Sequence, residues 1–264
     1  MIEHTINPVI VGIGNLEIRY YGLFYLLGLV FGYFMVNWLK KEFKINLTRD
    51  QVFDYTVYLA FGLFIGARLF YFIFYNPWVF WQSPLDILKL WHGGMSFHGG
   101  LVGALVAGFI FCKKNNVPFY KMADLTIIPT ALVLALGRIG NFINGELYGI
   151  AWDGLICIDY SNNPHLANPP EGCRFPSQIA ESLKNLVIFG TLFLIRGCRL
   201  ASGSILWIFV FMYGFFRFFI EFVRVPDPQL GLFFGFLSMG QILSLLMIIL
   251  GSVMFIRINV FKKL

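Results

Sequence analysis

Long apolar stretches dominate this sequence and constrain its fold more than any other feature. Hydrophobic residues occupy 58% of the 264 positions and charged residues only 13%, whereas charged residues make up about 25% of water-soluble domains. A soluble fold of this size could not bury that much apolar surface, so much of it is expected to face lipid. The stretches that could cross a bilayer lie approximately at residues 19–39, 51–75, 97–112, 122–137, 176–195, 203–222 and 234–256. The sequence therefore predicts an all-α polytopic membrane protein with seven spans, forming one integral-membrane domain over residues 1–264.

The basic residues between these stretches predict an orientation. Clusters at residues 40–44, 113–114, 196–199 and 257–263 fall at alternate ends of the seven stretches. Because basic loops stay in the cytoplasm, the N-terminus is expected outside and the C-terminus inside. The longest outer loop, residues 140–175, is also the most polar, and we expect it to form a small extracytoplasmic cap.

The charge pattern argues against a nucleic-acid partner. The formal net charge is +6, but the basic residues form short clusters beside apolar stretches, as membrane topology and contact with anionic membrane lipids require. The sequence has no zinc finger, RNA-binding signature or long basic arm, and no cysteine or histidine cluster has the spacing of metal ligands.

Two of the four cysteines, Cys157 and Cys173, share the predicted cap. On the oxidising side of a membrane they could form a disulfide, and two free thiols are the alternative. Cys112 and Cys198 lie at predicted cytoplasmic ends and are expected to be free.

The first polar motif opens the third apolar stretch, where His98 is followed by Gly99 and Gly100. Backbone N–H groups at a helix N-terminus can face an anion. Close helix packing through small residues, with a histidine at the membrane surface, is the alternative.

The second polar motif covers residues 137–149, at the end of the fourth stretch. It holds one arginine, two asparagines and one glutamate: Arg138, Asn141, Asn144 and Glu146. If the helix continues, Asn141 and Gly145 share a side with Arg138; otherwise the segment unwinds at its glycines. Either geometry suits a phosphate or glycerol headgroup, because arginine can bind phosphate oxygens through two parallel hydrogen bonds. A snorkelling arginine before a glycine-rich turn is the alternative.

The third polar motif is a helical stripe. Tyr213, Arg217, Glu221 and Arg224 fall at i, i+4, i+8 and i+11, while phenylalanines cover the other sides. One face of a helix therefore carries all four polar residues. The stripe either faces the other two motifs or only contains a structural Arg217–Glu221 pair.

Isolated polar groups add weaker signals. Tyr21 follows Tyr20 at the start of the first stretch, where both could simply be interfacial aromatics. Arg68 and Glu181 lie in or near predicted spans, so each is expected to need a partner.

Together these motifs resemble the bacterial prolipoprotein diacylglyceryl transferase family. Residues 137–149 match its pattern G-R-x-G-N-F-x-N-G-E-x-x-G at every fixed position. Further matches are the Tyr-Gly of the first stretch, the His-Gly-Gly-Leu of the third, and the stripe, which the family continues to Pro226-Asp227. Phe175 and Ala180 depart from the pattern of many members, which puts a catalytic role for their segment in doubt.

The resemblance implies a specific reaction. A diacylglyceryl group moves from phosphatidylglycerol to the lipobox cysteine thiol of a preprolipoprotein signal peptide, forming a thioether and releasing glycerol phosphate. The resemblance places this reaction at the outer leaflet of the bacterial inner membrane. We expect no cofactor and no metal, because phosphate is already a good leaving group.

The resemblance and the chemistry also suggest roles for residues. His98 is the first candidate for general base, Arg138 and Arg217 would bind the phosphodiester, and Tyr21 and Tyr213 would donate hydrogen bonds. The residues expected to bind or orient the headgroup are Asn141, Asn144, Gly145, Glu146, Gly149, Gly99, Gly100, Glu221 and Arg224.

Other classes of protein could also use polar residues inside a membrane. A transporter is the strongest alternative, although no convincing internal repeat is visible in this sequence. A membrane scaffold and a different phospholipid-using transferase are the others.

Overall fold

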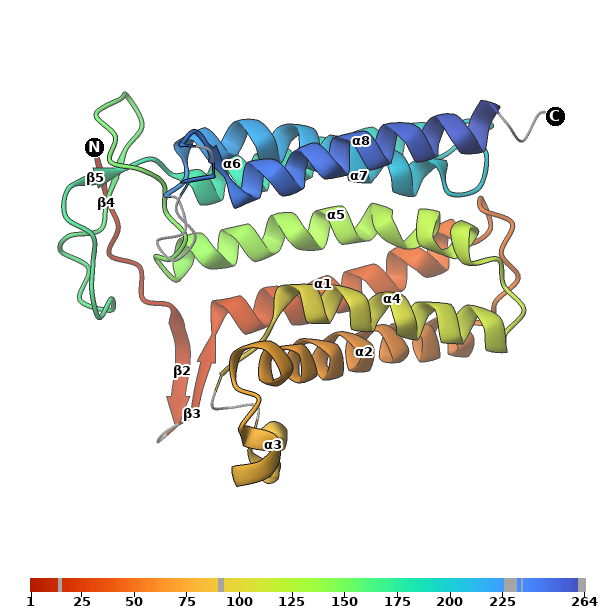
Figure 1. Ribbon diagram of the computed structural model, residues 1–264, viewed down its shortest axis with the longest axis horizontal. Coiled ribbons are helices and arrows are strands. Elements are labelled where there is room, and N and C mark those ends of the chain that lie inside the picture. Colours follow the sequence, from red (N-terminus) through yellow and green to blue (C-terminus); the bar gives the residue numbers. More distant parts are fainter. Residues whose placement is uncertain (14–15, 90–92, 226–231, 234, 261–264) are drawn as a thin grey trace. The chain divides into compact units, whose positions relative to one another are not determined.

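The computed structural model describes residues 1–13, 16–89, 93–225, 232–233 and 235–260 (Figure 1). Seven helices in these ranges are long and apolar enough to cross a membrane, which confirms the predicted all-α polytopic fold. They are α1 (Tyr20–Leu39), α2 (Arg49–Tyr75), α4 (Phe97–Lys114), α5 (Phe119–Ile143), α6 (Ser177–Ile195), α7 (Ser204–Ile220) and α8 (Met239–Val260). The predicted orientation stays a prediction.

Short elements connect these helices. The helical ones are α3 (Val79–Gln82), η1 (Pro84–Leu88) and η3 (Glu221–Val223). The strands are β1 (Ile2–Glu3), β2 (Val9–Ile13), β3 (Leu16–Arg19), β4 (Ile158–Asp159), β5 (Cys173–Arg174), β6 (Leu232–Phe233) and β7 (Leu237–Ser238).

Several helix boundaries differ from the prediction by two to six residues, and the two largest differences are at the end of α5 and the start of α8. α5 continues to Ile143, whereas its apolar stretch ends at Gly137, and α8 begins at Met239 rather than near residue 234. Hydropathy marks where apolar residues stop, but a helix continues where its polar side chains find partners inside the protein. The first four residues of the predicted cap, 140–143, therefore belong to α5.

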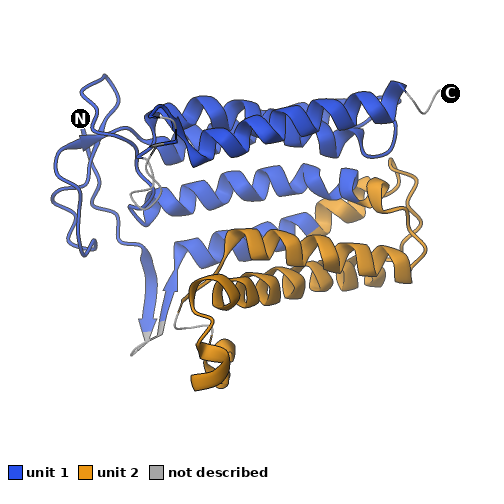
Figure 2. Cartoon of the chain, in the orientation of Figure 1, with its two compact units in different colours: residues 1–32, 123–264 blue, residues 33–122 orange. Residues whose placement is uncertain are grey.

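The chain divides into two compact units, which are described separately (Figure 2). Unit 1 contains residues 1–32 and 123–264, and unit 2 contains residues 33–122. The prediction of one membrane domain over residues 1–264 stays a prediction.

In unit 2, α2 and α4 pack closely through glycines. A Cβ atom added at Gly103 would lie 2.9 Å from both the Gly62 carbonyl carbon and the Gly66 Cα. The backbones of the two helices therefore approach as closely as small residues allow, as in many membrane helix pairs.

Arg68 on α2 was expected to need a partner because it lies inside a predicted span. It has such partners, and they are backbone carbonyls rather than an acidic side chain. Its guanidinium donates five hydrogen bonds to backbone carbonyls, and the side chain is buried. The accepting residues are Asp86, Ile87, Lys89, Gly93 and Gly94. Arg68 thus holds the segment between α3 and α4 against α2.

In unit 1, α7 and α8 lie side by side along most of their length (Figure 1). Gly214 of α7 faces the α8 backbone, where an added Cβ would lie 2.7 Å from the Ser244 oxygen. Gly251 of α8 faces Phe211 of α7 in the same way. A buried carboxylate, Asp124, accepts hydrogen bonds from the N–H groups of Gly203 (2.6 Å) and Leu206 (2.8 Å) and so caps the start of α7.

The cap of unit 1 is a small sheet with strand order β1-β4-β5. β1 pairs with β4 in parallel, and β4 pairs with β5 in antiparallel. Cys157 and Cys173 form a disulfide beside these strands, so the structure contains the first of the two alternatives that the sequence left open.

His4 connects the cap to the end of α5. Its Nε2 atom lies 2.7 Å from the Phe142 carbonyl oxygen, and its Nδ1 atom lies 2.8 Å from Asn163 Nδ2. Because Asn163 Nδ2 can only donate, Nδ1 is the acceptor and Nε2 carries the proton. The neutral ring therefore supports the last turn of the helix that carries the second polar motif.

Candidate active site

The second polar motif, residues 137–149, begins on the last turns of α5. The residues that follow the helix fold back and form hydrogen bonds with its end. Arg138 Nη1 donates to Asn141 Oδ1 at 3.4 Å, so the two side chains share one face as predicted for a continuing helix. Beyond the helix, the Glu146 N–H donates to the Asn141 carbonyl at 3.0 Å. Asn141 Nδ2 in turn donates to Glu146 Oε1 at 2.8 Å, and Asn144 Nδ2 donates to the same oxygen at 3.2 Å.

The two glycines that flank Arg138 allow α1 to approach α5. A Cβ atom at Gly140 would lie 3.0 Å from Tyr21 Cδ2, and one at Gly137 would lie 3.4 Å from the Tyr25 hydroxyl oxygen. The hydroxyls of Tyr21 and Tyr25 lie 3.1 Å apart. Tyr21, a predicted site residue, is therefore next to the second polar motif.

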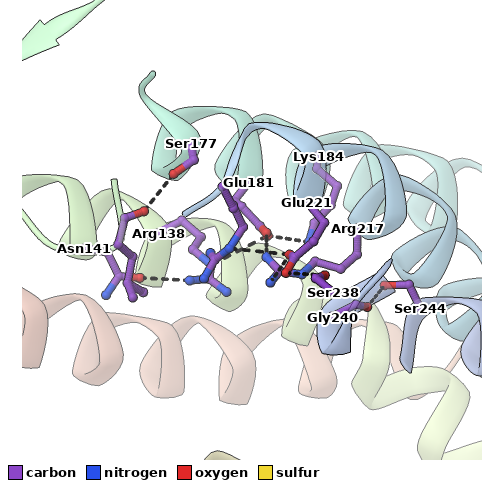
Figure 3. A network of polar contacts seen from close by, with 12 residues as sticks. Arg138, Asn141, Ser177, Glu181, Lys184, Arg217, Glu221, Ser238, Gly240 and Ser244 are labelled. Carbon is purple, nitrogen blue, oxygen red and sulfur yellow. Dashed lines mark hydrogen bonds and ion pairs between the residues drawn. The ribbon is translucent and has the colours of Figure 1, made fainter. Parts of the chain in front are cut away.

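Glu181 on α6 joins α5 to α7 and is completely buried (Figure 3). Its Oε2 atom lies 2.6 Å from Lys184 Nζ and 3.8 Å from Arg138 Nε, and its Oε1 atom accepts from Arg217 Nη1. One carboxylate thus contacts three cations from three helices.

The four residues of the third polar motif lie close together, but only Tyr213 and Arg217 are on α7, which ends at Ile220. The predicted continuous helical stripe is therefore wrong beyond Ile220, because Glu221 begins η3 and Arg224 has an extended backbone. Arg217 Nη2 lies 2.6 Å from Glu221 Oε2, and Arg224 Nε lies 3.6 Å from the same oxygen. The Tyr213 ring lies under the Lys184 ammonium, with 3.8 Å from Nζ to the ring centroid. The structural Arg217–Glu221 pair is present, and the motif also reaches α6 through Glu181.

We call the six ion-paired side chains the arginine cluster: Arg138, Glu181, Lys184, Arg217, Glu221 and Arg224. Four cations and two carboxylates leave an excess of two positive charges. Lys184 and the two acids are the more deeply buried members, with side chains 0–9% exposed, whereas the three guanidinium side chains are 17–23% exposed. The cluster therefore directs positive charge toward its accessible side.

Arg224 shows the effect of this excess charge. Burial lowers the pKa of Arg224 below its ordinary value, and repulsion from Arg217 lowers it further. Its Nε atom is also buried without a hydrogen-bond partner. An anion beside the guanidiniums would reduce this repulsion.

The first polar motif lies in unit 2, at the start of α4. His98 is exposed, with its ring edge-on to Phe97. The Gly99 N–H donates to the Ser96 hydroxyl at 3.3 Å, and the Gly100 N–H donates to the Ser96 carbonyl at 3.0 Å. These two N–H groups have partners at the start of α4, and the predicted role of Gly99 and Gly100 in binding the headgroup stays a prediction.

Gly149 and Gly145 have backbone roles in the structure. Gly149 pairs with Arg224 in an isolated bridge and donates its N–H to the Phe175 carbonyl at 2.9 Å. An added Cβ at Gly149 would lie 2.8 Å from that carbonyl oxygen, so only glycine fits between the two segments. Gly145 adopts φ +65°, a conformation that glycine favours, and lets the chain turn back after α5.

The segment around Phe175 stabilises the loop that follows α5. The Ser177 hydroxyl donates to the Leu147 carbonyl at 2.7 Å, and Gln178 Nε2 donates to the Glu146 carbonyl at 2.8 Å. Both side chains are buried. Phe175 and Ala180, which depart from the family pattern, therefore lie in a segment whose polar residues bond to the backbone of residues 146–147.

Sequence reasoning missed Lys184 and undervalued Glu181. Glu181 was predicted only to need a partner, and it has three; Lys184 was not singled out, although it is a charge inside an apolar stretch. That property, rare in membrane spans, was the available signal. Among the described residues, no group of three or more His, Cys, Asp or Glu side chains is placed to hold a metal ion.

The fold and the site define a class of protein. Seven apolar helices form an integral-membrane protein, and the arginine cluster gives it excess positive charge at membrane depth. Partly exposed guanidiniums backed by buried acids are suited to bind a phosphate group and to stabilise negative charge that develops on it.

Comparison with known proteins then identifies the family. A family model described as prolipoprotein diacylglyceryl transferase matches residues 8–257. The chain belongs to the prolipoprotein diacylglyceryl transferase family, and it is a membrane-embedded transferase.

Curated relatives agree over nearly the whole chain. Proteins named phosphatidylglycerol–prolipoprotein diacylglyceryl transferase are 40% identical in Geobacter sulfurreducens and 42% identical in Vibrio cholerae, covering 96% of this chain in each case. The matches cover 96% and 91% of those relatives. A relative of the same name in Rickettsia rickettsii is 38% identical over 97% of this chain and 98% of its own length.

Proposed function

We propose that this chain transfers the diacylglyceryl group of phosphatidylglycerol to the lipobox cysteine thiol of a preprolipoprotein. The thioether forms as glycerol phosphate leaves, which is the first step of bacterial lipoprotein maturation. The single observation that carries this proposal beyond family membership is the arginine cluster, whose excess positive charge lies on partly exposed guanidiniums.

The chemistry is a substitution at the glyceryl carbon that is bonded to the phosphate oxygen. The thiolate sulfur forms a bond to this carbon, the carbon–oxygen bond breaks, and its electron pair stays on the phosphate oxygen. The thiol proton passes to a base, because the thiolate is the nucleophile and a free cysteine has a pKa of about 8.5. The phosphate group gains one negative charge during the step, and fixed cations stabilise this charge.

Arg138 and Arg217 are the proposed phosphate-binding residues. Glu181 holds both guanidiniums from the buried side, which leaves their exposed edges for phosphate oxygens. Asn141 connects Arg138 to Glu146, so the amide and the carboxylate fix the guanidinium on one side. Arg224 would meet the headgroup or the peptide at the edge of the cluster.

The tyrosines and Asn144 are proposed to orient the headgroup. Tyr21 lies against Gly140, two residues after Arg138, and Tyr213 lies beneath Lys184. Asn144 Oδ1 has no protein partner and could accept a hydrogen bond from a glycerol hydroxyl. These groups would align the glyceryl carbon with the thiolate.

His98 is proposed as the general base that accepts the thiol proton. It is exposed on the first turn of α4 in unit 2, and a histidine is the usual proton acceptor near neutral pH. The assignment rests on the chemistry and on the family motif, and a substitution described below tests it.

We further propose that the protein resides in the bacterial inner membrane with its active site toward the outer leaflet. The partners would be phosphatidylglycerol, the lipobox signal peptide and the surrounding membrane lipids. The disulfide in the cap fits this placement, because disulfides persist on the oxidising side of that membrane.

The decisive experiment uses the purified full-length protein, a lipobox peptide and vesicles. We expect a thioether-linked diacylglyceryl peptide and one glycerol phosphate per peptide with phosphatidylglycerol vesicles, and no product with phosphatidylcholine vesicles. Movement of phosphatidylglycerol between leaflets without peptide modification would instead favour a transporter.

A further inference from the structure

The arginine cluster contains one cation more than the phosphodiester substrate requires. Arg138, Arg217 and Arg224 already exceed the two carboxylates by one charge, which matches the single negative charge of phosphatidylglycerol. Lys184 adds a second excess charge from a position where the side chain is only 1% exposed. A buried cation is costly, so its presence calls for a physical reason.

Lys184 pairs closely with Glu181, but one cation is enough to neutralise this carboxylate and three contact it. Arg217 already donates to Glu181 Oε1, and Arg138 lies 3.8 Å from Oε2. Lys184 Nζ takes the closest position on Oε2, at 2.6 Å, and its other contact is the Tyr213 ring face at 3.8 Å. Lys184 and Arg138 thus share Oε2, and the ammonium lies closer to it than the guanidinium does (Figure 3).

We infer that Lys184 is a positioning residue that adjusts the cluster to the charge of the departing phosphate rather than to that of the bound lipid. The inference rests on the proposed function. The phosphodiester carries one negative charge, whereas the released phosphate monoester carries close to two near neutral pH. The excess of two positive charges therefore matches the charge that develops as the carbon–oxygen bond breaks.

This matching has a kinetic consequence. An interaction that is stronger in the transition state than in the bound substrate raises kcat, whereas one that is equal in both lowers KM only. Lys184 has no face toward solvent and acts through Glu181 and Tyr213. It strengthens the hold of Arg138 and Arg217 on the leaving phosphate.

The test compares kcat, KM for phosphatidylglycerol and inhibition by glycerol phosphate in purified variants. For Lys184→Met we expect kcat to fall about 10- to 100-fold, which is less than the roughly 100- to 1,000-fold loss on removing one direct transition-state contact, because Lys184 acts through its neighbours. KM should change less than about threefold, and glycerol phosphate should inhibit at least about tenfold more weakly. Lys184→Arg should keep most of the wild-type kcat, and the exposed-lysine control Lys113→Met should match the wild type.

The thermal unfolding midpoint separates charge from structure. A merely structural salt bridge predicts that Lys184→Met lowers the midpoint but leaves kcat per folded protein and inhibition by glycerol phosphate unchanged. Where methionine prevents folding, Lys184→Gln repeats the comparison with a neutral polar side chain.

Failure of the proposed function can be distinguished from failure of the inference about Lys184. If the wild type does not modify the peptide, the proposed function fails. If the wild type is active but the folded neutral variants keep its kcat and its sensitivity to glycerol phosphate, the role of Lys184 alone is overturned.

Discussion

A planar guanidinium and an ammonium carry the same charge but bind phosphate differently, and Arg138 depends on that difference. Its Nη1 atom donates to Asn141, and its Nε atom faces Glu181, so the remaining N–H groups point in a fixed direction. For Arg138→Lys we expect kcat/KM to fall at least about 100-fold with normal membrane insertion, because charge remains and the fork is lost.

The measurement is phosphatidylglycerol-dependent peptide lipidation by detergent-purified protein. The control is Arg19→Lys, which changes an exposed arginine that pairs with Glu17. Near-normal turnover in Arg138→Lys would remove the bidentate phosphate contact from the proposal.

His98→Gln tests the proton acceptor. Glutamine resembles histidine in size and hydrogen bonding but cannot accept the thiol proton, so we expect kcat to fall about 100- to 10,000-fold. A variant that keeps a near-normal kcat would assign the proton to another group.

Single residues also show how far a sequence can predict a site. Arg138, Asn141, Arg217 and Glu221 could be selected because a charge or an amide in an apolar stretch needs a partner, and a helical repeat places such groups on one face. Which partner each group finds could not be predicted, because the contacts join helices that are distant in the sequence. Glu181 became the centre of the cluster only through that packing.

At the scale of elements, the pairing of α2 with α4 depends on individual glycines. For Gly103→Ala we expect a loss of about 1–3 kcal/mol in stability, because the new methyl group would press against the backbone of α2 at Gly62 and Gly66. The measurement is the thermal unfolding midpoint in detergent.

Gly100→Ala provides a matched control on the same helix. Its Cβ would meet Leu63 Cγ at 3.4 Å and Ala67 Cβ at 3.5 Å, which are ordinary contacts. An equal loss of stability in both variants would show that helix propensity or lipid contact, rather than backbone approach, determines the effect.

Helix boundaries mark where sequence prediction of elements fails. The seven spans could be predicted because length and hydropathy suffice for a helix that crosses lipid. The polar end of α5 could not, since Asn141 and Glu146 stabilise each other only once the chain has turned back at Gly145. The same applies to the strands of the cap, which are only two residues long in β1, β4 and β5.

At the scale of the whole molecule, His4 makes stability depend on pH. Burial lowers the pKa of His4 below its ordinary value of 6.5, so the folded protein favours the neutral ring that bonds Phe142 and Asn163. As the pH falls through 6.5 the unfolded chain takes up a proton and the folded chain does not. Stability is therefore highest above this pH and falls below it.

We expect the thermal midpoint of the wild type to decrease between pH 7.5 and pH 5.5. His4→Gln should lower the midpoint at pH 7.5 and reduce the slope, because no group at this position then titrates. An unchanged slope in the variant would assign the pH dependence to other residues.

The orientation of the chain in the membrane can be tested at the two ends of α6. α6 contains 19 residues, which corresponds to about 28 Å and so to the thickness of the hydrocarbon core. The cap strand β5 ends just before α6, and the exposed free thiol of Cys198 lies just after it. The two must therefore face opposite sides of the membrane.

The positive-inside rule places Cys198 in the cytoplasm. In spheroplasts that express a Cys112→Ser background, a membrane-impermeant maleimide should leave Cys198 unlabelled until the membrane is opened with detergent. Asn168→Cys in the same background, an exposed position in the cap, should react without detergent. The opposite pattern would place the cap and its disulfide in the reducing cytoplasm, and the active site would then face the wrong leaflet for secreted lipobox peptides.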